Sequence, residues 1–212
     1  MDTYNSYLAQ FQKEKNTFII QMEEYAKQHS VPIMDSGAIE TLLGLLSIQK
    51  PLRVLEIGSG IGYSAIRMAE SLPDTFITTI ERNNDRYTKA VDFIGTSTFG
   101  NRIQIIEADA LDLEIDTLQD KTYDALFIDA AKGQYKRFFE KYSPKVPFGG
   151  VIYCDNMFMH GMVLRDDIDL PRRSRSMIRN LREFTGWVMA HPDYDSILLP
   201  VGDGILIAKK KE

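Results

Sequence analysis

The chain has 212 residues, of which 44% are hydrophobic, so it is long enough and apolar enough to form one domain with a buried core. Lys and Arg number 25 against 30 Asp and Glu, and the formal net charge of −5 excludes a polycation that holds nucleic acid by bulk charge. The single cysteine, Cys154, excludes a disulfide framework and a cysteine-rich zinc site. A polar N-terminal stretch and the lack of long apolar runs predict a cytoplasmic protein without signal peptide or membrane contact.

Residues 1–50 are predicted to form a helical extension. Apolar side chains recur there at helical spacings among polar residues, namely Tyr7, Phe11, Phe18, Met22 and Tyr25. The segment 31–34 contains Pro32 and should end this first helix. Asp35 or Ser36 then caps a second, leucine-rich helix.

Beyond Pro51, short runs rich in Val, Ile and Phe alternate with helical segments. The predicted strands are Arg53–Ile57, Phe76–Ile80, Arg102–Ile106, Tyr123–Ile128 and Val151–Cys154, and the predicted helices are Tyr63–Ser71, Asp85–Gly95, Gln134–Tyr142 and Ser174–Ala190. Two last strands, Ser196–Val201 and Ile205–Lys209, flank the turn-forming residues Gly202-Asp203-Gly204. The alternation predicts an α/β fold with helices on both faces of a parallel sheet, in a single domain over residues 1–212 whose core is 51–212.

Each of the five predicted parallel strands carries an acidic residue at or just beyond its end, and these are Glu56, Glu81, Asp109, Asp129 and Asp155. In open α/β sheets, ligands bind at the carboxyl ends of the strands, so these acids should line one edge. Any one of them could serve only to solubilise the start of a loop. Acids at all five strand ends favour a ligand site.

The first strand runs into the glycine-rich segment Gly58-Ser59-Gly60-Ile61-Gly62. Glycines such as Gly58 let the backbone turn sharply and approach a ligand closely, although a tight turn needs no ligand. A dinucleotide fingerprint would have its third glycine at position 63, which is Tyr63, so a dehydrogenase is disfavoured. Glu81 is placed to accept hydrogen bonds from the two hydroxyls of a ribose, and Glu56 would favour a cationic ligand.

Two neighbouring strand ends supply oxygen ligands. The carboxylates of Asp129 and Asp155 and the amide of Asn156 suit Mg²⁺ or a similar divalent cation. The alternative is that Asp129 and Asn156 only cap a helix and a turn. Lys132 follows Asp129 by one helical turn, where its amine could act as a general base near the cation.

With these motifs, the chain resembles the Rossmann-like class I methyltransferases that use S-adenosylmethionine, whose sheet is mostly parallel with an antiparallel last strand. The residues from Asp129 to Lys132, with Asp155-Asn156, further resemble the metal-dependent O-methyltransferases of the catechol and caffeoyl-CoA type. This resemblance implies that Asp129, Asp155 and Asn156 hold the metal and that Lys132 is the catalytic base. The expected cofactor site consists of Met34, Ser64, Glu81, Asp109, Ala110 and Asp129 from the resemblance, with Glu56 and Gly58 from the first loop.

Within this family, the segments 31–34, 62–68, 128–135, 191–194 and 200–204 are similar to bacterial members that act on tRNA. The similarity implies methylation of the 5-hydroxyl of 5-hydroxyuridine, at the anticodon wobble position, to 5-methoxyuridine. Ala130 and Ala131 replace the aromatic pair that often follows the first metal-binding Asp, so a larger substrate should fit. The apolar N-terminal helices and the resemblance together suggest a homodimer, and no DNA is expected as a partner.

An acid-free stretch before and within the last long helix contains Arg172, Arg173, Arg175, Arg179 and Arg182. Arginine suits phosphate recognition, and we expect Arg172, Arg173 and Arg175 to contact tRNA, although a solvated helix face is the alternative. Residues 165–173 are expected to form a mobile flap over the site.

Two other functions stay open. A small-molecule O-methyltransferase of the catechol or caffeoyl-CoA type would use the same catalytic residues without an RNA role. A non-catalytic nucleotide-binding module is disfavoured, because the complete predicted metal set and Lys132 would then have no use.

Overall fold

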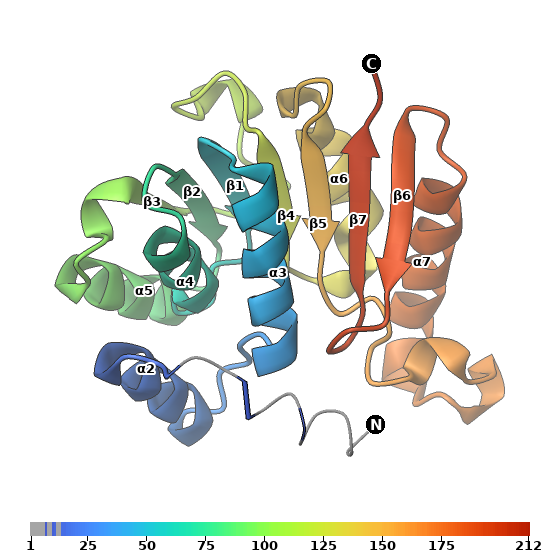
Figure 1. Ribbon diagram of the computed structural model, residues 1–212. Coiled ribbons are helices and arrows are strands. Elements are labelled where there is room, and N and C mark those ends of the chain that lie inside the picture. The colour runs from blue at the N-terminus through green and yellow to red at the C-terminus, as the bar shows by residue number, and fades with distance from the viewer. Residues whose placement is uncertain (1–6, 8–9, 12–13) are drawn as a thin grey trace.

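The structure is a computed structural model that describes residue 7, residues 10–11 and residues 14–212. Within these residues, one seven-stranded sheet has the order β3-β2-β1-β4-β5-β7-β6 (Figure 1). The strands are β1 Arg53–Ile57, β2 Phe76–Glu81, β3 Ile103–Glu107, β4 Ala125–Ile128, β5 Val151–Cys154, β6 Tyr194–Leu199 and β7 Ile205–Lys210. Strands β1 to β5 pair in parallel, whereas β7 is antiparallel to both of its neighbours, β5 and β6. The predicted α/β class and the antiparallel last strand are therefore confirmed.

Helices cover both faces of the sheet (Figure 1). They are α2 Thr17–Gln28, α3 Ser36–Gln49, α4 Tyr63–Ser71, α5 Asn84–Thr96, α6 Tyr135–Tyr142 and α7 Arg172–Met189. Short 3₁₀ helices occupy Gly100–Arg102, Ile115–Thr117, Lys132–Gln134, Ser143–Lys145, Met162–Leu164 and Asp167–Asp169. None of the helices in the described part of the chain is long and apolar enough to cross a membrane.

Two hydrophobic cores lie on opposite faces of the sheet because successive side chains of a strand point to opposite sides. Val54 and Phe127 join the core that α2 to α5 cover, while the adjacent Leu55 and Leu126 join the core under α6 and α7. All four residues of β4 are buried, which is why this strand is apolar throughout. The buried strands fix the carboxyl edge of the sheet, where the acidic residues lie.

The N-terminal extension differs from its prediction at one point. Helix α2 begins at Thr17 because the side-chain oxygen of Asn16 accepts a hydrogen bond from the Ile19 amide at 2.9 Å. Residues 14–16 are not helical, so a continuous helix from Tyr7 to Tyr25 is wrong. The part of that prediction on residues 8–9 and 12–13 lies outside the described residues.

The second predicted helix is confirmed as α3. Asp35 is its N-cap, and its carboxylate accepts hydrogen bonds from the amides of Gly37 at 2.8 Å and Ala38 at 3.4 Å.

Candidate active site

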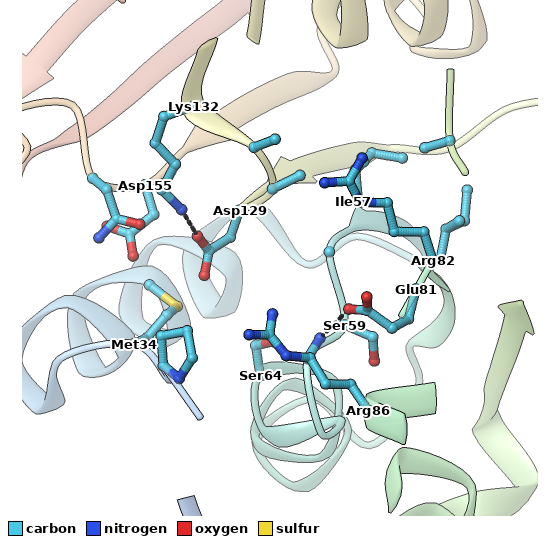
Figure 2. A pocket seen from close by; sticks show the side chains of 18 of the residues that line it. Met34, Ile57, Ser59, Ser64, Glu81, Arg82, Arg86, Asp129, Lys132 and Asp155 are labelled. Atoms are coloured by element: carbon cyan, nitrogen blue, oxygen red, sulfur yellow. Dashed lines mark hydrogen bonds and ion pairs between the residues drawn. The ribbon is translucent and has the colours of Figure 1, made fainter. Parts of the chain in front are cut away.

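A cavity of about 440 Å³ lies at the carboxyl edge of the sheet, a size that suits a small-molecule ligand (Figure 2). Most of the predicted site residues come together here. The cavity is lined by Met34, Gly58, Ser64, Glu81, Asp109, Ala110, Asp129, Lys132, Asp155 and Asn156. The side chains labelled in Figure 2 form two groups at different places in the cavity, one around Glu81 and the other around Asp129.

Gly58 sits where the first loop passes the end of β4. A Cβ atom at this position would lie 2.2 Å from the backbone oxygen of Asp129, and the φ angle of Gly58 is +99°. Both the space and the backbone conformation therefore require glycine. The close approach of the two loops brings the glycine loop and the Asp129 carboxylate into one cavity.

Glu81 organises the end of the cavity that contains the glycine loop. Its two carboxylate oxygens accept hydrogen bonds from the backbone amides of Gly60 and Asn83, each at 2.8 Å. A carboxylate offers about four lone-pair sites, so Glu81 can still accept hydrogen bonds from a ligand.

Arg82 and Arg86 also line this end, and the sequence analysis did not select them. The sequence feature that could have identified Arg82 is its position directly after the strand-end acid Glu81. Arg82 donates to the Asp109 carboxylate at 3.2 Å. The hydrogen bond from the Leu111 amide, together with Arg82, holds the pKa of Asp109 below its ordinary value.

Glu56 does not line the cavity, so its predicted contact with a cationic ligand is wrong. It is fully buried, and its carboxylate accepts hydrogen bonds from the hydroxyl of Ser64 and, at 2.5 Å, from that of Thr79. Burial raises the pKa of Glu56 to about 7. Glu56 therefore fixes the position of Ser64 by accepting its hydroxyl hydrogen bond, and Ser64 itself lines the cavity.

The second group of side chains centres on an ion pair. Lys132 begins the 3₁₀ helix after β4, and its Nζ donates to the Asp129 carboxylate at 2.5 Å (Figure 2). The two side chains are only 19% and 21% exposed, which strengthens their attraction relative to a surface pair. The predicted proximity of Lys132 to Asp129 is confirmed.

Asp155 lies beside this ion pair at the end of β5 and is 1% exposed (Figure 2). Neither of its carboxylate oxygens has a hydrogen-bond partner. Burial, with the nearby Asp129 carboxylate, raises the pKa of Asp155 well above its ordinary value. The hydroxyl of Tyr135 donates to the Asp155 backbone oxygen at 2.9 Å and thereby fixes the position of this residue.

The donor set fits a hard divalent cation. Buried carboxylates are normally paired or bound to a metal, and the oxygens of Asp155 are unpaired in a cavity that Asp129 and Asn156 also line. Within the described residues, no cluster of three or more His, Cys, Asp or Glu side chains is arranged to hold a metal. The predicted set has two carboxylates and one amide, so it does not require such a cluster.

The arginine-rich helix α7 begins beside the loop that follows β5, at the carboxyl edge of the sheet (Figure 1). Arg172 and Arg173 are exposed at its start and do not line the cavity. Arg175 instead donates to the backbone oxygens of Leu170 and Ile168, both at 3.1 Å. Two nitrogens of its guanidinium are therefore used within the protein, and the contact of Arg175 with RNA stays a prediction.

Arg182 has the same kind of structural role. It donates to the Val163 backbone oxygen at 3.0 Å and to the Asp167 carboxylate at 2.6 Å. Together with Arg175, it attaches the predicted flap, residues 165–173, to α7, and this segment contains one short 3₁₀ helix, Asp167–Asp169.

Among the other cavity-lining residues that the sequence analysis did not place there are Met159, His160 and Asp203. Asp203 belongs to the predicted hairpin turn, whose glycine-rich composition was noted only as a turn signal. Its contribution to the site depends on the pairing of β5 with β7, which brings residue 203 next to the loop after β5.

A family model described as O-methyltransferase matches residues 9–211 of the chain. Caffeoyl-CoA O-methyltransferase 1 of Arabidopsis thaliana is 30% identical over 201 residues, which cover 90% of this chain and 76% of that protein. A caffeoyl-CoA O-methyltransferase of Populus kitakamiensis is 28% identical over 186 residues, covering 85% of this chain and 78% of the relative.

Solved structures agree with the fold. A Staphylococcus aureus protein that carries the name of a caffeoyl-CoA O-methyltransferase is 35% identical, with a TM-score of 0.89 and coverage of 98% of both chains. An O-methyltransferase of Bacillus cereus, in complex with SAH, is 23% identical, with a TM-score of 0.83 over 98% of this chain and 97% of that chain. These relatives bear out the predicted family, while the similarity to members that act on tRNA stays a prediction.

Proposed function

Because the chain belongs to the O-methyltransferase family, its chemistry is S-adenosylmethionine-dependent transfer of a methyl group to an oxygen, and we propose that a divalent cation assists this transfer. The observation that carries the proposal is the buried, unpaired carboxylate of Asp155 beside the Asp129–Lys132 ion pair. A buried charge without a partner is unfavourable, and a bound cation would offset that penalty.

Asp129, Asp155 and Asn156 would hold Mg²⁺ or a similar cation. When bound, the cation stabilises the negative charge of a hydroxyl that loses its proton and so lowers the pKa of that hydroxyl. Lys132 would take the proton, because a cation on the two carboxylates disfavours the ammonium form of the lysine. Asp129 holds the Nζ of Lys132 at 2.5 Å and thereby positions the amine beside the acceptor.

The other end of the cavity suits the methyl donor. S-adenosylmethionine supplies a methyl group bound to a positively charged sulfur. Glu81 would accept hydrogen bonds from the ribose hydroxyls, and it keeps the Gly60 amide in place while doing so. Met34, Ser64, Asp109 and Ala110 also line the cavity and would contact the rest of the donor.

The relatives favour a small acceptor of the caffeoyl-CoA type, whose ring carries two adjacent hydroxyls. After Lys132 takes its proton, one of these oxygens would bond to the methyl carbon as the bond from that carbon to the sulfonium sulfur breaks, and S-adenosylhomocysteine would leave. The named relatives at 28% to 30% identity are caffeoyl-CoA enzymes, and this supports the assignment.

One observation favours a second acceptor, 5-hydroxyuridine in tRNA. Arg172 and Arg173 are exposed at the edge of the sheet where the cavity lies, and arginine suits phosphate. The small side chains of Ala130 and Ala131 line the acceptor end and leave room for a nucleotide. The 5-oxygen and the 4-carbonyl of this base are adjacent, as the two oxygens of a catechol are.

A cytoplasmic location and a homodimeric state both stay predictions. Light scattering of the purified protein tests the dimer.

A parallel assay decides between the acceptors. Metal-free protein is supplied with S-adenosylmethionine, Mg²⁺ and either caffeoyl-CoA or an anticodon stem-loop RNA that contains 5-hydroxyuridine, and the products are analysed by mass spectrometry. Methylation of only one acceptor assigns the substrate. Undiminished activity in excess EDTA would refute the role of the cation.

Asp155→Ala is the matched variant for that assay. It should abolish methyl transfer and leave the affinity for S-adenosylhomocysteine, measured by calorimetry, unchanged. The variant should fold at least as stably as the native protein, because the removed carboxylate is buried and makes no hydrogen bond. Full activity of a folded Asp155→Ala protein would contradict the metal assignment.

A further inference from the structure

The loop after β5 has an unusual backbone. Asn156, Met159 and His160 have φ angles of 57°, 45° and 52°, in the left-handed region that residues other than glycine seldom adopt. Such conformations persist only where the surrounding structure holds them. We name residues 156–160 the acceptor loop, because it carries the predicted metal ligand Asn156 and two cavity-lining side chains.

The turn between β6 and β7 holds the acceptor loop in place. The backbone oxygen of Asp203 accepts a hydrogen bond from the Phe158 amide at 2.7 Å, and that of Gly204 accepts one from the Met157 amide at 3.0 Å. The Asp203 carboxylate adds a third hydrogen bond, from the His160 amide at 2.6 Å. The loop and the turn are more than 40 residues apart in sequence and touch only because β5 pairs with β7.

Glycines allow this close contact on both sides of Asp203. A Cβ atom on Gly204 would lie 2.8 Å from the ring of Phe158, and one on Gly202 would lie 2.7 Å from the Cβ of Ala38 in α3. The turn is therefore packed between the acceptor loop and α3, and it cannot move without displacing one of them.

The two oxygens of the Asp203 carboxylate have different environments. Oδ1 accepts the hydrogen bond from the His160 amide, while Oδ2 is buried without a hydrogen-bond partner. The side chain is only 11% exposed and lines the cavity. The substitution Asp203→Asn removes the charge of the carboxylate but keeps an oxygen that can accept the hydrogen bond from the His160 amide. It therefore separates the effect of the hydrogen bond from the effect of the charge.

We propose that Asp203 is a positioning residue that holds the acceptor loop, and with it Asn156, in the conformation that the reaction needs. The inference rests on the proposed function, since it assigns Asn156 to the cation. Through the hydrogen bond to the His160 amide, Asp203 also fixes the wall that the acceptor contacts.

Amide hydrogen exchange of the metal-free protein, measured by NMR, tests the positioning role directly. The informative amides are those of Met157 and Phe158, because their backbone acceptors survive every substitution of the Asp203 side chain. In Asp203→Ala both amides should exchange about ten- to a hundredfold faster, the effect of one lost charge-assisted hydrogen bond. Asp203→Asn should stay close to the native rates.

Calorimetry with Mn²⁺ and steady-state kinetics give a second, separate readout. Asp203→Ala should weaken Mn²⁺ binding about tenfold or more and raise the KM of the acceptor, while the affinity for S-adenosylhomocysteine stays unchanged. Asp203→Asn should restore most of the Mn²⁺ affinity and most of the native KM. Gly149→Ala is the control, because Gly149 also has a positive φ, +79°, but has no atom within 4 Å of an added Cβ. It strains the backbone away from the acceptor loop and should leave Mn²⁺ binding and the KM of the acceptor unchanged.

Unchanged exchange rates of the Met157 and Phe158 amides in Asp203→Ala would overturn the proposal. An equal acceleration of exchange in Asp203→Asn would also overturn it, because the effect would then come from the charge of the carboxylate and not from its hydrogen bond. If native protein binds no Mn²⁺, the metal part of the proposed function fails, whereas the exchange rates still decide whether Asp203 holds the loop.

Discussion

Glu56 offers a quantitative test of the electrostatics beneath the cavity. It is fully buried and accepts hydrogen bonds from Ser64 and Thr79, and burial raises its pKa from 4.5 to about 7. The perturbation is Glu56→Gln, which keeps the size of the side chain and one oxygen acceptor but cannot ionise. Because both hydroxyl partners can donate or accept, a glutamine can still be hydrogen-bonded at this position.

The magnitude follows from linkage. A difference between 4.5 and about 7, at about 1.4 kcal/mol for each pH unit, corresponds to about 3 kcal/mol of unfolding free energy. Because the folded protein binds the proton more tightly, this stabilisation is fully present below pH 4.5 and is lost as the pH rises through about 7. The unfolding free energy of the native protein minus that of Glu56→Gln should therefore fall by about 3 kcal/mol between pH 4.5 and pH 8.

Urea denaturation of both proteins at several pH values measures this difference. Subtraction cancels the other titrating groups, which the two proteins share. Glu24→Gln, on the exposed surface of α2, is the matched control and should show no such dependence. A difference between the native protein and Glu56→Gln that stays constant over this pH range would refute the assignment of a raised pKa to Glu56.

Three further predictions address the cavity. Gly58→Ala should lower activity by about a hundredfold in steady-state assays, because its Cβ would displace the Asp129 backbone, and near-native activity would contradict the tight contact. Glu81→Ala should weaken S-adenosylhomocysteine binding about ten- to a hundredfold by calorimetry, and an unchanged affinity would mean that the donor lies elsewhere. The double variant Arg172→Ala, Arg173→Ala should raise the KM for a tRNA acceptor and lower its log–log salt slope by about 0.7 to 0.9 for each lost phosphate contact. Turnover of the free 5-hydroxyuridine nucleoside, which has no phosphate, should stay unchanged, so an equal loss on tRNA and on the nucleoside would assign these arginines to the fold.

Much of the arrangement was predictable from local pattern. Apolar runs alternating with helical segments predicted the parallel strands and their order along the chain. Strands of a parallel sheet are buried on both faces, so each of them is apolar along its own sequence. Acids at the strand ends predicted the edge where the cavity lies, because parallel strands bring their carboxyl ends together. The short spacing of Lys132 from Asp129 was enough to predict their contact, although residues 129–131 are not helical and the 3₁₀ helix begins only at Lys132.

What the sequence by itself determined was therefore the set of elements and the edge at which the functional groups meet. Only the tertiary structure decided which side chain faces the cavity and which faces the protein. Glu56 turned out to be buried against Thr79 of the next strand, and Arg175 bonds the loop before α7. Asp203 reaches the acceptor loop across more than 40 residues of sequence through the pairing of β5 with β7. Periodicity describes a residue relative to its own helix or strand, whereas these partners belong to other segments, and only the packing of those segments brings them together.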